Sequence, residues 1–228
     1  MAAIALILLL LLLAYKATTE GLSNFYAQSA HQEIERWSRF PQAYRPDDWT
    51  RVMQYLGKSL DYSPASPWPL EERASLQLRS VGAARDAQLA VASVRSANAD
   101  LRLALAQRPT SPFAWANFVL TKLYLDEQDD ELFRALALAE ELGPWEPEVQ
   151  QSVVLAGLAV WDRLDPARQA GVLRAMQRGA RRDPAKIAEI ATSFSRIDLF
   201  CGLGYISKQG EEVCSKTSKS LSKPNRPQ

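Results

Sequence analysis

The chain has 228 residues, of which 47% are hydrophobic and 23% are charged, enough for one folded domain and a targeting segment. Its net charge of +1 favours neither nucleic acid nor an acidic substrate, so we expect no nucleic-acid partner. Ten glycines leave little material for hairpin turns or phosphate-binding loops, and most of the thirteen prolines lie where helices should begin or end. This balance predicts an all-α fold.

An unbroken apolar run begins the chain, from Ala2 to Ala14, and is followed by Tyr15 and Lys16. About thirteen residues is short of the roughly 17 to 25 that a spanning helix needs and fits the apolar region of a secretory signal. Lys16 stands where a small residue should precede a cleavage site, so residues 1–16 are interpreted as an uncleaved signal anchor rather than a cleaved signal peptide. A buried core helix is a third interpretation, but the leucine run Leu8–Leu13 leaves it no polar face.

Residues 17–62 are predicted to form juxtamembrane helices. Gly21 to Asn24 looks like a break and a cap before a helix that ends near Pro41. Asp47 and Asp48 then open a second helix, because acidic residues suit the positive N-terminal end of a helix. The proline-rich turn from Tyr62 to Pro69 is taken as the boundary with the following segment.

Residues 63–200 are predicted to form a stack of helical hairpins. The central hairpin runs from Ser111 to Pro144, which is about the length of a tetratricopeptide unit. It has an N-cap and a proline at its start and Gly143-Pro144 at its end. The repeat is degenerate, because the glycine, tyrosine and alanine positions of a strict tetratricopeptide repeat are only partly filled. Further helices are expected over the ranges 70–81, 86–107, 147–164, from Asp165-Pro166 and from Asp183-Pro184.

Few residues in the sequence suggest catalysis. His31 is the only histidine and has no paired nucleophile, so it is interpreted as structural or exposed. Carboxylate pairs such as Glu140 and Glu141 are adjacent in sequence and point in different directions on a helix, whereas an acid/base couple needs converging groups. We therefore expect no catalytic, cofactor-binding or metal site, and no enzyme.

Arginines crowd the last predicted hairpin. They form a candidate interaction face for an acidic glycan, a lipid phosphate or a partner protein. The alternative is that they are the polar side of an amphipathic helix. The residues proposed for this face are Arg174, Arg178, Arg181 and Arg182, and Arg163 and Arg168 lie nearby in the sequence.

Two cysteines, Cys201 and Cys214, lie in the C-terminal segment 201–228. An exported chain meets an oxidising compartment, so they are candidates for a small disulfide; two unpaired thiols are the alternative. No histidine or second cysteine pair accompanies them, which leaves no metal site to propose. The basic tail from Lys216 to Gln228, rich in serine, lysine and proline, is predicted to be disordered.

Two segments carry a resemblance to a known family: Arg108 to Asn117, reading RPTSPFAWAN, and Glu141 to Pro147, reading ELGPWEP. They resemble the VpsP family of membrane-anchored, tetratricopeptide-like proteins associated with exopolysaccharide biosynthesis in Gram-negative bacteria. The N-terminal anchor and the sequence Leu199-Phe200-Cys201 also fit that layout. The resemblance implies a process and a location, and it carries no catalytic motif.

The leading interpretation is a non-catalytic scaffold that acts by protein–protein interaction. It would be held in the inner membrane by residues 1–16, with other proteins of a polysaccharide synthesis or export machinery as its partners. We expect its helical domain on the periplasmic side, although Lys16 after the anchor argues for the cytoplasmic side by the positive-inside rule. The alternative function is a helical enzyme or binding protein that acts on an acidic glycan or a lipid-linked sugar.

Overall fold

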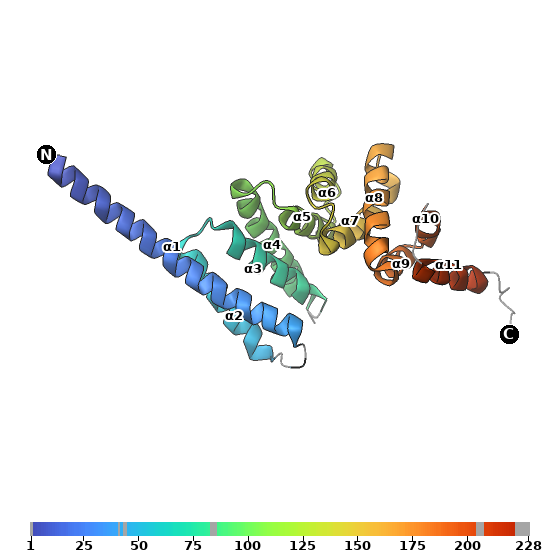
Figure 1. Cartoon of the computed structure of the whole chain (residues 1–228), viewed down its shortest axis with the longest axis horizontal. Helices are drawn as coiled ribbons and strands as arrows, with labels where there is room; N and C mark the ends of the chain where they lie inside the picture. The colour runs from blue at the N-terminus through green and yellow to red at the C-terminus, as the bar shows by residue number, and fades with distance from the viewer. Residues whose placement is uncertain (1, 41, 43–44, 83–85, 204–207, 222–228) are drawn as a thin grey trace. The chain divides into compact units, whose positions relative to one another are not determined.

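The structure is a computed structural model that describes residues 2–40, 42, 45–82, 86–203 and 208–221 (Figure 1). The described residues form helices and turns without a strand, which confirms the all-α prediction. They divide into two compact units, Met1–Pro109 and Thr110–Gln228. The division therefore falls after Pro109, whereas the sequence pattern predicts a boundary between residues 62 and 63.

The first helix, α1 (Ala2–Arg39), is continuous through the segment from Gly21 to Asn24, so the break predicted there is wrong. A single glycine costs a helix only about 1 kcal/mol relative to alanine, and the burial of Ser23 and Ala27 of α1 offsets this cost. Residues 2–18 are exposed, and α1 is long and apolar enough to cross a membrane. The N-terminal part of α1 projects from unit 1 with no other helix beside it (Figure 1).

Unit 1 has its core where α2 (Pro46–Tyr62) packs along the second half of α1. Ala30, Val52, Leu56 and Leu76 form the buried centre of this core. The helices α3 (Pro67–Val81) and α4 (Ala87–Gln107) form a tightly packed pair in the same unit. The predicted ends of this pair are close to the observed ones, because Asp86 caps α4 and Gly82 follows α3.

Unit 2 consists of successive hairpins, and the predicted caps at Ser111, Asp165 and Asp183 are joined by a further cap at Asp129. The side chains of Ser111, Asp129, Asp165 and Asp183 each accept a hydrogen bond from a backbone N–H in the first turn of the helix that follows. The helices are α5 (Pro112–Tyr124), α6 (Asp130–Leu142), α7 (Pro147–Ala159), the short 3-10 helix η2 (Trp161–Arg163), α8 (Pro166–Arg182) and α9 (Pro184–Ser193).

Within unit 2 each helix packs on its hairpin partner and on the next hairpin. α5 packs on α6 and α7 packs on α8, while α5, α7 and α9 contact one another in turn and α6 contacts α8. Gly157 permits a close approach of α7 and α8, because a Cβ added there would overlap both Cγ atoms of Val172 on α8. This pattern of contacts is the one expected of a hairpin stack.

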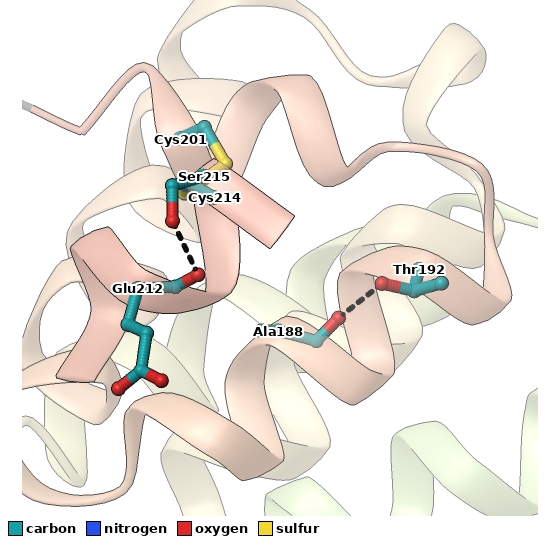
Figure 2. Close-up of a disulfide and its surroundings, with 6 residues drawn as sticks. All are labelled: Ala188, Thr192, Cys201, Glu212, Cys214 and Ser215. Atoms are coloured by element: carbon teal, nitrogen blue, oxygen red, sulfur yellow. Dashed lines mark hydrogen bonds between the residues drawn. A yellow bond between two sulfur atoms is a disulfide. The ribbon is translucent and has the colours of Figure 1, made fainter. Parts of the chain in front are cut away.

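The C-terminal segment of unit 2 packs on α9. α10 (Ile197–Cys201) and α11 (Lys208–Leu221) both contact α9, and a disulfide joins Cys201 to Cys214 with 5.7 Å between their Cα atoms (Figure 2). α11 extends to Leu221, so the first part of the tail for which disorder is predicted is helical. The rest of that tail, residues 222–228, lies outside the described residues.

Candidate functional site

The arginines singled out by the sequence lie along one stripe of α8. Arg174, Arg178, Arg181 and Arg182 are spaced by four, seven and eight residues, which places them on one side of the helix. Arg181 and Arg182 are exposed at the last turn. Arg174 and Arg178 instead reach toward α6 and pair with a carboxylate there.

Glu140 of α6 receives both of these arginines. Arg174 donates from Nε to Oε1 at 3.2 Å and from Nη2 to Oε2 at 2.9 Å, a two-pronged geometry that favours a guanidinium over an ammonium group. Arg178 donates from Nη2 to Oε1 at 2.6 Å. Two of the four arginines proposed as an interaction face therefore join two hairpins of unit 2 to each other.

The electrostatics of Glu140 follow from this pairing. Burial raises the pKa of the Glu140 carboxyl, but the hydrogen bonds and positive charges of Arg174 and Arg178 outweigh burial and hold the pKa below its usual range. The same contact raises the pKa of Arg174. Glu140 is thus an ionised carboxylate at neutral pH.

A pocket of about 310 Å³ opens beside this cluster, between α6, α7 and α8. Its apolar lining includes Leu136, Val153 and Val172, and Gly171 leaves room where Arg174 meets Glu140. A second ion pair, Asp165 with Arg168, stands at its other side. The pocket combines an apolar lining with two charged pairs at its rim.

The chemistry available in this pocket is binding rather than acid/base catalysis. The backbone N–H groups of Arg168 and Ala167 and the Arg168 side chain lower the pKa of Asp165, against a smaller opposing effect of burial. Glu140 and Asp165 are thus both ionised and both held by arginine, whereas an acid/base couple needs two groups with pKa values pushed apart. None of the described residues that line the pocket is a histidine, cysteine, serine or threonine.

A second concavity of unit 2 lies on the side where α5, α7 and α9 meet. It has a volume of about 330 Å³ and takes residues from all three helices. Leu155 of α7 is 36% exposed there, which is high for a leucine in a helix packed on both sides. The lining residues are Leu120, Glu148, Gln151, Ser152, Leu155, Lys186, Glu189, Ile190 and Ser193.

His31, interpreted from the sequence as structural or exposed, joins two helices of unit 1. Its Nδ1 lies 2.6 Å from Oε1 of Glu72 on α3, and its ring meets Trp68 edge-on at 5.3 Å. Burial raises the pKa of Glu72, and the contacts with His31, Trp68 and Arg79 oppose this rise without cancelling it. Among the described residues no group of three or more His, Cys, Asp or Glu side chains could hold a metal ion.

Sequence reasoning identified Glu140 as one of two adjacent carboxylates and missed its pairing with the arginines of α8. Glu140 and Arg174 are 34 residues apart, which is one hairpin repeat. A search for opposite charges one repeat apart on facing helices would have found the pair. Asp162 and Arg196, whose Oδ1 and Nη2 atoms lie 2.6 Å apart, form an ion pair with the same spacing in the sequence.

The comparisons with known proteins give no relative: no family model matches the chain, and no curated protein matches it.

Proposed function

We propose that this chain is a non-catalytic scaffold, held at a membrane by α1, whose unit 2 binds another protein. The observation that carries the proposal is the open groove lined by α5, α7 and α9. Successive hairpins each contribute one helix to it, and stacks of this kind bind along such extended surfaces. The groove offers an exposed leucine, Leu155, between polar side chains that can hydrogen-bond to a peptide, Gln151 and Ser152.

The membrane attachment rests on α1, whose first half is apolar and exposed. The disulfide between Cys201 and Cys214 supports a compartment that is oxidising, such as the periplasm. Lys16 argues for the opposite orientation by the positive-inside rule. Fusing a reporter that is active on only one side of the membrane to the C-terminus decides between the two orientations.

The resemblance of two segments to the VpsP family extends the proposal to exopolysaccharide assembly at the inner membrane. The partner would then be another component of the synthesis or export machinery. Deletion of the coding sequence should lower exopolysaccharide output, and the full-length chain should restore it. Restoration by a chain that lacks residues 2–16 would contradict the need for the anchor.

The test of the groove is cross-linking of the full-length chain in its membrane, with and without Leu155→Glu. A glutamate at this exposed position should abolish the cross-linked product, because it places a charge against the partner's apolar side chain. Leu103→Glu on α4 is the matched control, because Leu103 is 52% exposed and lies in unit 1. Equal cross-linking by both variants would contradict the groove as the binding surface.

A second candidate function is supported by the pocket beside Glu140. Arg168 and Arg174 stand at its rim and are 40% and 56% exposed, so they can also donate to an acidic sugar. Titration calorimetry with oligogalacturonate tests this function. Binding of oligogalacturonate that is lost in Arg168→Gln and in high salt would favour this second function. The absence of any heat of binding would leave the scaffold as the remaining proposal.

A further inference from the structure

The apolar run of α1 is too short for the membrane that it would have to cross. Ala2 to Ala14 is about thirteen residues, or about 20 Å of helix, whereas the hydrocarbon core is about 30 Å thick. Because α1 continues without a break to Arg39, the residues that follow Ala14 can supply the missing length. About seven more residues are needed, which brings the edge of the core close to Gly21.

The residues between Ala14 and Gly21 suit that position. The hydroxyls of Thr18 and Thr19 donate to the backbone carbonyls of Ala14 and Lys16 at 2.8 and 2.9 Å, so neither needs water as a partner. Lys16 carries its charge on a long flexible stem that can reach the headgroups from within the core.

Unit 1 begins at the same level of α1. The hydroxyls of Ser23 and Ser59 are 3.0 Å apart, and the hydroxyl of Ser63 donates to Glu20 at 3.2 Å. α2 therefore runs back along α1 and ends beside Glu20. The C-terminal end of α2 lies at the depth where the hydrocarbon core should end.

Aromatic side chains gather on this end of unit 1. Phe25 is 64% exposed and meets the ring of Tyr26 edge-on, and the rings of Tyr26 and Tyr62 are nearly parallel at 6.0 Å. Tyr55 and the ammonium group of Lys58 also approach Tyr26. Aromatic rings with one apolar and one polar end are enriched at the boundary between membrane and water.

We propose that this end of unit 1, formed by Leu22, Phe25, Tyr26, Lys58 and Tyr62, sits in the headgroup layer of the bilayer. The inference rests on the proposed anchoring by α1. It adds that unit 1 is seated on the bilayer rather than tethered above it. Lys16 and Lys58 are balanced by Glu20 and Asp61, so the surface fits zwitterionic phospholipid and needs no anionic lipid.

The experiment uses the full-length chain in phosphatidylcholine vesicles whose acyl chains are brominated, which quenches a nearby bimane label. Labels are attached to single cysteines in Leu11→Cys, Phe25→Cys and Gln32→Cys, while the disulfide protects Cys201 and Cys214. These three positions lie on one side of α1 at increasing distance from its N-terminus, and all three are exposed. Tyr62→Cys tests the same depth from α2.

We expect loss of bimane emission at Leu11, Phe25 and Tyr62 and none at Gln32, which is two turns beyond Phe25. Loss at Leu11 with none at Phe25 and Tyr62 would overturn the seating and leave the anchor in place. No loss at Leu11 would overturn the anchor and the seating together. Loss at Gln32 equal to that at Phe25 would place the boundary elsewhere and contradict the inference. Loss of emission at Phe25 and Tyr62 that occurs only when anionic lipid is added would contradict the fit to zwitterionic phospholipid.

Discussion

The ammonium group of Lys122 lies 2.7 Å from Oδ2 of Asp129, and this pair closes the turn between α5 and α6. Lys122 is 2% exposed, and Glu127 and Glu131 also pair with it at 3.0 and 3.1 Å. Burial lowers the pKa of Lys122, but the hydrogen bonds that its ammonium group donates to these three carboxylates outweigh burial and raise the pKa. A buried charge in this hairpin is thus matched by three acidic groups.

Replacing the buried lysine tests that arrangement. Lys122→Met should lower the free energy of unfolding by about 3 kcal/mol, the low end for a broken buried pair, because the carboxylates left behind are partly exposed to water. Lys186→Met is the control, since Lys186 is 42% exposed and pairs with Glu189 one turn away. Chemical denaturation measures both variants, and equal losses would contradict a special role for Lys122.

The close approach of α7 and α8 is tested at Gly157. Gly157→Ala should destabilise the chain by about 1–3 kcal/mol, because the added methyl group would overlap the side chain of Val172. Gly57→Ala, in α2, makes the same change where nothing lies within 4 Å of the added carbon. It should be neutral or stabilising by up to about 1 kcal/mol. Thermal unfolding of the two variants compares them, and a stable Gly157→Ala would show that the helices can separate.

Most of the helices of unit 2 could be predicted from the sequence because their signals are local. A cap followed by proline, as in Asp165-Pro166 and Asp183-Pro184, places the first residue of α8 and of α9 correctly. The glycine at position 157 also indicates a close neighbour, and Val172 of α8 lies there. The apolar pattern of the sequence from Phe113 to Leu120 predicts a buried Trp115, but Trp115 is partly exposed in the structure.

The candidate site could not be predicted in the same way. The pairing of Glu140 with Arg174 depends on the register between two hairpins, which no local pattern encodes. The continuity of α1 through Gly21 is a tertiary effect, because Ser23 and Ala27 are buried against α2 and hold the helix where propensity alone favours a break.

The buried carboxyl of Glu72 predicts a dependence on pH. Its pKa is raised in the folded chain, so its contribution to stability is full below the unfolded value of about 4.5 and is lost as the pH rises through the folded value. Glu72→Gln keeps the shape and removes the titration. The stability of the natural chain relative to Glu72→Gln should therefore fall as the pH is raised from below about 4.5 to neutrality. Urea denaturation across this range measures the difference; a difference that rises with pH would contradict the raised pKa.

Two pairs of arginines on α8 are expected to have different roles, one in stability and one in partner binding. Arg174→Glu/Arg178→Glu adds two carboxylates beside that of Glu140. It should lower the free energy of unfolding by about 2–3 kcal/mol, less than the loss of a fully buried pair, because Arg174 is 56% exposed. Adding Glu140→Lys should restore much of this stability. Arg181→Glu/Arg182→Glu makes the same charge change at exposed positions and should lower the melting temperature less than Arg174→Glu/Arg178→Glu does. Partner binding is then measured in that second variant. A loss of binding while folding stays intact supports docking by the end of α8, provided that the loss is larger in low salt than in high salt. Normal binding there would leave Arg181 and Arg182 as part of the solvated side of the helix.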